Sequence, residues 1–373
     1  MQDKKLHIIS FDNPFPPFYG GVIDVFYKIK ALHTIGVKIH LHCFVDKIPE
    51  SCIELNSITE KVYFYKSSKN PFLFFSRIPF SVISRNNKEL LKNLNRDVAP
   101  ILFENLKTTF LVNRDSLPEH KKVLRLQNIE QDYFLGISKT EQSIIRKISY
   151  YFESLKYKVF EENIIKFDKV FSISKFEDEY ISSKFHNSVY IPVFHGNTEV
   201  IPLTDFGEYT LYHGDLKTAD NKEVVRFLVS VFKDIPTAKL VIASGTNQKF
   251  VSQLIAKQPN IHFELISNFE HLQQLLNKAH INISWSFQKS GTKLKLINSL
   301  FNSRFSIINE NIVDDELISN LCFLVKTKQE LVLKIQEVTI MPYNDFTNRK
   351  NILENYLNDI KNAGLIMDLI DTL

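Results

Sequence analysis

The chain has 373 residues, which is too long for one ordinary hydrophobic core, so two domains are the default expectation. Its hydrophobic content of 44% and charged content of 24% are ordinary for a soluble globular protein, and a net charge of +4 is too small to indicate a nucleic-acid binder. The three cysteines have neither metal-ligand spacing nor a pairing pattern, and no apolar run approaches the roughly 20 residues of a membrane span. We therefore expect a protein of a reducing, cytoplasmic compartment.

The N-terminus, MQDKKLHIISF, is charged and only briefly apolar, which is unlike a signal peptide. Residues 6–11 predict a strand, and the proline-rich loop DNPFPPFYGG after it ends in Gly20 and Gly21. Apolar periodicity over 22–32 predicts a helix, and 37–45 predicts the next strand. This strand, loop, helix and strand unit lacks the GxGxxG of a dinucleotide site, so the two glycines fit a tight turn as well as a ligand loop.

The rest of the first half continues the alternation. Residues 70–85, NPFLFFSRIPFSVISR, are aromatic, basic and irregular. Partial burial is our preferred interpretation of them, and contact with lipid at the inner face of a membrane is the alternative. Residues 140–167 predict one long helix, preceded by the polar loop QNIEQDY. Further strands are predicted at 62–65, 100–104, 123–127, 169–174 and 188–194.

Residues 197–209 are rich in Pro, Thr, Gly and acidic residues and predict a linker. The alternation then restarts with strands TLYHGD, KLVIAS, IHFELI, INISWSF, FSIIN and CFLVK, separated by helical segments. Such alternation predicts parallel sheets covered on both faces. The sequence therefore predicts an α/β protein with two Rossmann-like domains, 1–200 and 201–343, facing each other across a cleft, followed by a final helix over 344–373.

The stretch 281–309 is a complete strand, polar turn, helix and strand. Its turn contains Ser290 and Gly291 and lies at the carboxyl end of the first strand, where open α/β sheets bind ligands. A helix that begins after such a turn offers free N–H groups to a phosphate. Lys293 and Lys295 follow in its first turn, where cations oppose the helix dipole. An anionic ligand explains them, and so does a solvated helix face.

The order and spacing of these motifs over nearly the whole chain resemble the GT-B glycosyltransferases, in particular the GT4-like group. The segments that carry the resemblance are FPPFYGGVIDVFYKIKALHTIGVKIHLHCF, NIEQDYF, KVFSISKFE, YHGDL and SGTKLKLINSLFNSR. The resemblance implies that the C-terminal domain holds the nucleotide of a sugar donor, that the N-terminal domain holds the acceptor, and that the final helix crosses back onto the N-terminal domain.

The resemblance also implies a reaction. A sugar would pass from a UDP- or GDP-linked donor to a glycan or lipid-linked hydroxyl acceptor, with retention of configuration, without a metal or cofactor, in polysaccharide biosynthesis. Backbone N–H groups of Gly20, Gly21, Ser290, Gly291 and Thr292 would meet the diphosphate, because small residues permit close approach.

Other roles follow residue by residue from the resemblance. Lys293 and Lys295 would stabilise the departing nucleotide diphosphate. Asn298 stands where the family's helix has a glutamate for the ribose hydroxyls. The remaining cleft residues expected at strand ends are His213, Gly214, Ser244 and Gly245.

The chain departs from the family's pattern at several of these positions. The family's paired glutamates fall on Ser290 and Asn298, and its loop basic pair falls near Asp215 and Asn221, with Lys217 and Lys222 as candidate substitutes. In place of a cleft histidine in the N-terminal domain, two strand ends carry polar residues, and Glu104 is the catalytic candidate among them: Glu104, Lys107, Gln127, Asn128 and Glu130.

Two other functions stay open at this point. Loss of the glutamates and of the basic pair fits an inactive relative that binds a nucleotide or a glycan. A phosphorylase or epimerase on the same fold is the third hypothesis, and a phosphorylase would need a lysine-bound pyridoxal cofactor. His40 and His42 share one face of a strand but lack a third ligand, so we expect no metal site. The oligomeric state is left open.

Overall fold

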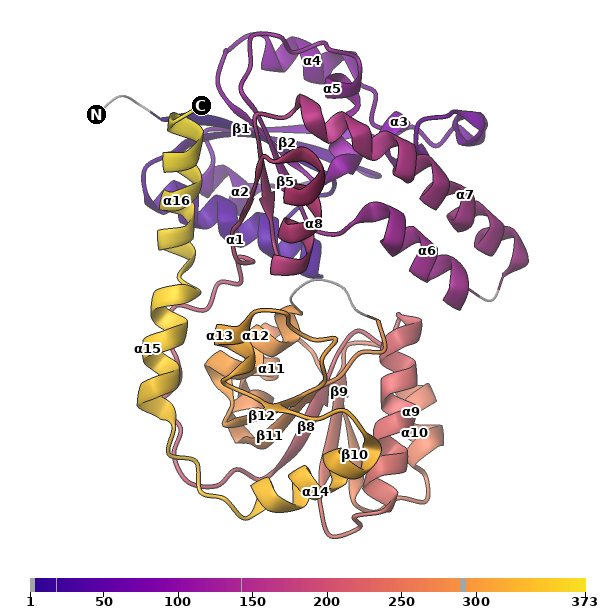
Figure 1. The fold of residues 1–373 in the computed structure, drawn as a ribbon, viewed down its shortest axis with the longest axis vertical. Helices are drawn as coiled ribbons and strands as arrows, with labels where there is room; N and C mark the ends of the chain where they lie inside the picture. The colour runs from indigo at the N-terminus through magenta and orange to yellow at the C-terminus, as the bar shows by residue number, and fades with distance from the viewer. Residues whose placement is uncertain (1–3, 18, 142, 289–292) are drawn as a thin grey trace. The chain divides into compact units, whose positions relative to one another are not determined.

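The computed structural model describes residues 4–17, 19–141, 143–288 and 293–373. The chain forms two compact units, of which the first comprises residues 1–196 and 359–373 and the second residues 197–358 (Figure 1). Each unit is a parallel β-sheet with helices on both faces, which confirms the fold class expected from the sequence.

The sheet of the first unit has seven strands in the order β3-β2-β1-β4-β5-β6-β7, and its pairings are parallel. The order reverses between β1 and β4, which makes this pair the switch point where open α/β sheets bind ligands. The strands are β1 (Lys5–Ser10), β2 (Lys38–Val45), β3 (Lys61–Lys66), β4 (Ile101–Glu104), β5 (Lys122–Leu126), β6 (Lys169–Ser172) and β7 (Ser188–Tyr190).

The sheet of the second unit has six strands in the order β10-β9-β8-β11-β12-β13, again with parallel pairings. Its switch point lies between β8 and β11, and the loops that follow these two strands are the natural ligand-binding loops of this unit. The strands are β8 (Tyr209–His213), β9 (Leu240–Ser244), β10 (Ile261–Leu265), β11 (Ala279–Ser284), β12 (Phe305–Ile308) and β13 (Phe323–Leu324).

The central strands are apolar at nearly every position because both sheet faces are covered. In β1, Ile8 belongs to the core packed beneath α1 and α16, whereas Ile9 belongs to the core on the opposite face. Successive side chains of a strand point to opposite faces, so one continuous apolar run supplies both cores.

The helices of the first unit include a long pair, α6 and α7, that pack against each other (Figure 1). The helical segments are α1 (Gly20–Thr34), α2 (Ile53–Ile58), η1 (Pro71–Phe75), α3 (Phe80–Ile83), α4 (Lys88–Leu94), η2 (Leu106–Thr108), α5 (Phe110–Asn113), α6 (Glu130–Thr140), α7 (Ile144–Phe160), η3 (Glu161–Lys166), α8 (Lys175–Phe185) and α16 (Asp359–Asp371).

The helix predicted over 140–167 corresponds to α7 and η3, whereas the polar loop predicted before it is wrong from Glu130 onward. Most of the predicted loop is the start of α6, and the chain turns back between α6 and α7. The Ser154 hydroxyl donates to the main-chain oxygen of Gln131 at 2.9 Å, which ties α7 against α6. Helix α6 escaped detection because the polar residues at its start are also common in loops.

The helices of the second unit are α9 (Ala219–Lys233), α10 (Gln248–Ile255), α11 (Phe269–Lys278), α12 (Leu294–Asn302), α13 (Glu316–Ser319), α14 (Lys328–Thr339) and α15 (Phe346–Tyr356). Among the described residues, none of the helices is both long and apolar enough to cross a membrane.

The C-terminal segment divides between the two units. The single helix expected over 344–373 is two helices, and α15 belongs to the second unit, where the buried Arg349 donates to the main-chain oxygen of Ser303 at 2.6 Å. Only α16 returns to the first unit, where Ala363, Ile366 and Met367 join the core beside α1. The expected crossing back of the C-terminal helix is confirmed for α16.

Candidate functional site

The carboxyl edge of the second sheet brings together two predicted site residues, His213 and Lys295. His213 is the last residue of β8, and Lys295 lies in the first turn of α12, directly after the turn that follows β11. The Lys295 ammonium group donates to the main-chain oxygen of Trp285 at 2.9 Å and lies 5.1 Å from the ring centroid of Tyr212. The switch point of this sheet therefore holds a partly buried cation.

At neutral pH the charged and the neutral form of Lys295 are present in similar amounts. Burial, together with the charge of Lys293, lowers the pKa of Lys295 to about 7, and Asp220 opposes that shift. An anionic ligand would favour the charged form and raise the pKa again. Such a lysine can respond to a phosphate by taking up a proton.

His213 is a buried neutral group at the same edge. Burial, reinforced by the charge of Lys295, lowers the pKa of His213 to about 4, so the imidazole is uncharged at neutral pH. Its Nε2 atom is buried and makes no hydrogen bond within the described part of the chain. A buried polar atom without a partner is costly, and such groups concentrate at functional sites.

The loop that follows β11 is held by two residues that the sequence analysis missed. Asp220, in the first turn of α9, accepts hydrogen bonds from the Ser286 hydroxyl at 2.8 Å and from the Phe287 N–H at 2.9 Å. Asn309, directly after β12, donates to the main-chain oxygen of Ser286 at 2.8 Å. The available signal was the position of Asp220 at the start of the helix that follows β8 and of Asn309 directly after β12, but their partners lie far away in sequence.

The other predicted residues of this unit have mainly structural contacts. Ser244 is buried and its hydroxyl accepts from the N–H groups of Leu216 and Thr246, which ties together the loops after β8 and β9. A Cβ atom on Gly214 would lie 3.2 Å from Nδ2 of Asn221, so glycine permits the close packing of this loop on α9.

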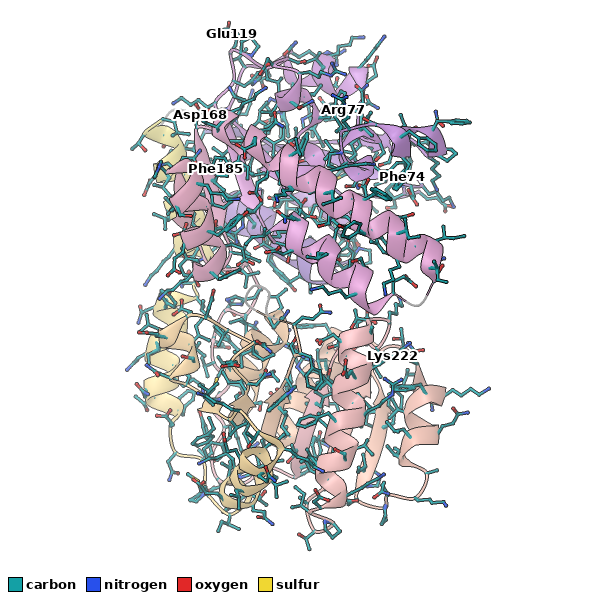
Figure 2. The ribbon with its side chains drawn as sticks, turned by 45° about the vertical axis from the view of Figure 1, so that its right-hand side comes forward. Phe74, Arg77, Glu119, Asp168, Phe185 and Lys222 are labelled. Carbon is teal, nitrogen blue, oxygen red and sulfur yellow. The ribbon has the colours of Figure 1, made fainter. Side chains whose placement is uncertain are left out.

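Three further predicted residues of the second unit, Lys217, Lys222 and Gly245, lie in α9 and in the loops after β8 and β9. Gly245 and Lys217 are exposed, and the Lys217 N–H donates to the Asp215 carboxylate at 3.0 Å. Lys222 lies with its ammonium group 6.0 Å from the ring centroid of Phe250, against α10 (labelled in Figure 2).

Asn298 is one turn beyond Lys295 on α12 and is nearly buried. Its side-chain oxygen accepts from Asn197 at 3.0 Å, and the amide of Asn302 donates to Asn197 at 2.9 Å. The three amides join α12 to the segment that enters the second unit. Ser290, Gly291 and Thr292, which were predicted to meet a phosphate, lie outside the described residues.

In the first unit, Gly20 and Gly21 open α1. A Cβ atom on Gly21 would lie 2.8 Å from Cζ of Phe11 and 3.0 Å from Oε1 of Gln127. The Gln127 amide also donates to the main-chain oxygen of Gly21 at 3.4 Å. This packing explains the glycine whether or not a ligand approaches it.

Glu104, the catalytic candidate of the first unit, is fully buried among other charges. Lys28 lies 2.8 Å from the Glu104 carboxylate and 2.9 Å from that of Asp24, and Arg125 lies 2.9 Å from Asp24. Burial raises the pKa of Glu104, while the neighbouring cations Lys28 and Arg125 act against that shift. The placement favours a structural role for Glu104, because it holds α1 to β4 and presents no carboxylate to solvent.

A second charged pair joins the residues after β4 to the start of α6, with Lys107 partly exposed and Glu130 buried. Glu130, at the start of α6, accepts from the Asn105 amide at 2.5 Å and lies 3.6 Å from the ammonium group of Lys107. Asn105 has a positive φ of 71°, which is strained for a residue with a side chain. Strained backbone beside an ion pair at a switch point is typical of functional sites, and the sequence had placed Lys107 and Glu130 there.

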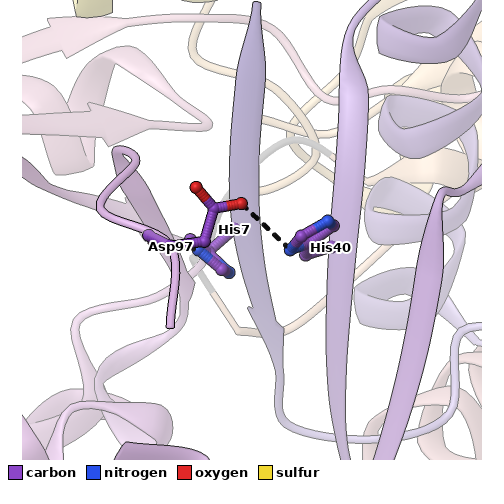
Figure 3. Close-up of side chains that lie close together, drawn as sticks. All are labelled: His7, His40 and Asp97. Atoms are coloured by element: carbon purple, nitrogen blue, oxygen red, sulfur yellow. Dashed lines mark hydrogen bonds and ion pairs between the residues drawn. The ribbon is translucent and has the colours of Figure 1, made fainter. Parts of the chain in front are cut away.

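A cluster of histidines lies away from these edges, near the amino ends of β1 and β2 (Figure 3). The structure supplies what the sequence did not show, since His7, His40 and Asp97 offer possible metal ligands within 4.8 Å of one another. Hydrogen bonds already occupy two of these groups. His7 contacts the main-chain oxygen of Asp97 at 2.9 Å and the ring of His42 at 3.0 Å, and Lys5 lies 2.5 Å from the Asp97 carboxylate.

Burial keeps His7 and His42 neutral, and the contacts then set their tautomers. A main-chain oxygen can only accept, so His7 Nε2 carries a hydrogen and His7 Nδ1 accepts from His42. Burial lowers the pKa of His7 to about 4 and that of His42 well below its usual value. His7 and His42 are thus hydrogen-bonded parts of the core, whereas the buried Nε2 of His40 has no hydrogen bond among the described residues.

Comparison with known proteins gives one relative by sequence and many by fold. An uncharacterized 44.6 kDa protein in the cps region of Klebsiella pneumoniae is 27% identical over 324 residues, which covers 81% of this chain and 82% of that protein. No protein-family model matches the chain.

The solved structures with similar folds share little sequence. Anabaena HepE in complex with UDP aligns with a TM-score of 0.67 and 11% identity over 99% of this chain and 100% of that one. A glycosyltransferase from Rickettsia africae gives a TM-score of 0.66 and 13% identity over 100% and 99%. The UDP-forming trehalose-phosphate synthase of Burkholderia vietnamiensis gives 0.63 and 10% identity over 99% and 100%. The chain therefore has the GT-B fold.

Proposed function

We propose that the chain is a glycosyltransferase that moves a sugar from a nucleotide-sugar donor to a hydroxyl acceptor. The observation that carries the proposal is the proximity of Lys295 to His213, whose Nε2 atom has no hydrogen-bond partner among the described residues, at the switch point of the second sheet. A GT-B fold with a cation at this edge suits a nucleoside diphosphate. The similar HepE was solved in complex with UDP, and the similar trehalose-phosphate synthase is described as UDP-forming.

In this proposal the second unit binds the donor. Lys295 and Lys293 would face the negative charge that builds up on the diphosphate as the sugar leaves, which is where fixed charges accelerate a reaction most. His213 would offer its free Nε2 to a donor hydroxyl or phosphate oxygen. Asp220 and Asn309 would act indirectly, because they hold the loop that the Lys295 ammonium group contacts.

The first unit would bind the acceptor, with Lys107 and Glu130 as the charged pair that follows β4 and β5. The bond from the sugar's anomeric carbon to the diphosphate oxygen breaks, the bond to the acceptor oxygen forms, and the acceptor proton passes to the departing diphosphate. We infer a retaining, metal-independent step of the GT4-like type, in which the protein supplies position and charge.

The substrates follow by similarity. We infer a UDP-linked donor rather than a GDP-linked one, since the similar HepE was solved with UDP and with UDP-glucose. The relative in a cps region accords with a glycan acceptor in polysaccharide biosynthesis. The three cysteines are free thiols, which accords with a cytoplasmic protein.

An inactive relative is the second candidate function. It is favoured by Asn298, which replaces the expected glutamate and whose amide oxygen already accepts from Asn197. Such a protein would bind a nucleotide and release no product.

A thermal-shift screen with UDP, GDP, ADP and their sugar derivatives tests the proposal. A ligand present at a hundred times its Kd adds roughly 2.7 kcal/mol of stability, which raises the Tm by several degrees. We expect UDP to stabilise the wild type and not Lys295→Met, with the exposed Lys233→Met as the matched control. Release of UDP from a UDP-sugar then separates the transferase from the inactive relative, and no shift with any nucleotide overturns both.

A further inference from the structure

Helix α7 has an exposed face made of large apolar side chains. Its buried residues, Glu153, Ser154, Tyr157 and Phe160, lie on one side. The residues that face solvent recur every three or four positions along the whole helix, as expected for a single stripe. They are Ile144, Ile145, Ile148, Tyr151, Phe152, Leu155 and Val159, with exposures from 43% to 79%.

The stripe is wide and continuous. At 100° per residue the seven side chains fall within an arc of about 120°, and at ~1.5 Å per residue the helix is about 25 Å long. Monomeric soluble proteins rarely expose a contiguous apolar surface of this kind without a partner. Helix α7 thus packs on α6 with one face and exposes a second, apolar face to solvent.

The charges of α7 all have one sign where they are exposed. Arg146, Lys147 and Lys158 are exposed, and the helix's acidic residue, Glu153, is buried and lies 2.8 Å from Lys156. A helix with an apolar stripe and exposed cations is typical of one that lies in the plane of an anionic membrane surface.

The neighbouring segment η1 extends the same surface. Phe72 and Phe75 are exposed by 76% and 84%. Lys156 of α7 donates to the main-chain oxygen of Phe74 at 2.6 Å and lies 4.2 Å from the centroid of its ring, which holds η1 beside α7 (Figure 2). Arg77, labelled in the same figure, adds an exposed cation next to it.

The sequence analysis placed any lipid contact within residues 70–85, a segment that contains Phe74, Phe75 and Phe80. Phe74 and Phe80 are partly buried, so Phe75 is the one of these that is exposed. Most of the apolar surface belongs to α7, which the sequence had read as part of a longer helix.

From these observations we infer that the face formed by α7 and η1 docks on an anionic lipid bilayer. The helix lies flat with its stripe among the acyl chains, and Lys147 and Lys158 contact headgroup phosphates. A second copy of the chain fits less well, because a two-fold contact through this stripe would bring the cations of both copies together. The inference goes beyond the proposed transferase function, since docking requires no donor.

Vesicle flotation tests the inference. The wild type should float with vesicles that contain phosphatidylglycerol, bind neutral phosphatidylcholine vesicles at least tenfold less, and be released by salt. Ile148→Glu with Leu155→Glu should reduce binding at least tenfold, and Phe72→Ser with Phe75→Ser should reduce it less. The matched control is Leu333→Glu, at an exposed leucine on α14 of the second unit. Circular dichroism confirms that each variant is folded.

Two results would overturn the docking surface. One is wild-type protein that stays in solution with anionic vesicles. The other is a dimer, measured by light scattering, that the Ile148→Glu, Leu155→Glu variant dissociates while vesicle binding is unchanged. UDP binding is measured on the same variants and should be unaffected, so failure of docking is distinguishable from failure of the proposed function.

Discussion

Lys295 on α12 donates a hydrogen bond to the main-chain oxygen of Trp285, the residue that directly follows β11. The contact brings the ammonium group to the switch point of the second sheet and partly buries it beside Tyr212. A hydrogen bond to a neutral oxygen does not replace a counter-ion, so the lysine keeps a lowered pKa. For this reason Lys295 is the cation that we propose for contact with a diphosphate.

Nucleotide binding should weaken as the pH rises. The pKa of free Lys295 is about 7, and a bound diphosphate raises it, so binding takes up a proton above neutral pH. We expect the Kd for UDP to rise by up to roughly tenfold per pH unit from about pH 7.5 to about pH 9. Titration calorimetry checks this, and Lys295→Met should flatten the profile. An equally steep profile in the variant would assign the proton to another group.

Lys107 and Glu130 should affect turnover more than donor binding. They lie in the first unit, at the strand end proposed for the acceptor. We expect Lys107→Ala or Glu130→Gln to reduce kcat by roughly 100-fold, the scale of a lost charge or proton-transfer group. UDP affinity should change less than twofold. The exposed Lys121→Ala is the control, and a kcat equal to that of the wild type in both variants would remove the pair from the site.

Lys28→Met should destabilise the first unit strongly. It removes a cation that serves both Asp24 and Glu104 and leaves buried carboxylates behind. Breaking a buried pair in this way costs roughly 3–5 kcal/mol, measured by urea unfolding. Glu104→Gln in the same chain should recover part of the loss, because a neutral amide no longer needs the lysine. The exposed Lys30→Met on the same helix should have little effect, whereas additive losses would mean that Lys28 and Glu104 act independently.

The histidine cluster should make the first unit sensitive to acid. The folded-state pKa of His7 is lowered to about 4 from an ordinary 6.5, so the unfolded chain binds the proton more readily. The stability that neutral His7 contributes is complete above pH 6.5 and is lost as the pH falls from there to about 4, a change of about 3 kcal/mol.

Unfolding of His7→Phe across this pH range checks the prediction. The variant should be less stable than the wild type at neutral pH but should lose less stability on acidification, and the exposed His33→Gln should behave like the wild type. Equal acid sensitivity of His7→Phe and the wild type would mean that other groups control acid unfolding.

The sequence predicted the sheets well because their strands are buried on both faces and therefore read as apolar runs. It placed β8 and β11 correctly, and with them His213 and the helix that carries Lys295. It missed α6, because the polar residues at the start of that helix are also common in loops. It did not show that the apolar stripe on α7 is exposed, because such a stripe resembles a face packed on a core.

The candidate site was predictable only in part. Position after a strand identified Lys107, Glu130 and Lys295, since that depends on local pattern alone. The burial of Glu104 depends on Lys28 and Arg125, which lie far from it in sequence, and no local pattern shows whether a strand-end carboxylate faces solvent or a buried cation. For the same reason Asp220 went unnoticed until its bonds to Ser286 and Phe287 were seen.

The central claim is that the second unit binds a nucleoside diphosphate through Lys295, and titration calorimetry with UDP tests it most directly. The account predicts saturable one-to-one binding to the wild type and to Lys233→Met, and at least tenfold weaker binding to Lys295→Met. Wild-type affinity in Lys295→Met, or no heat of binding with UDP or GDP in any of the three proteins, would contradict it.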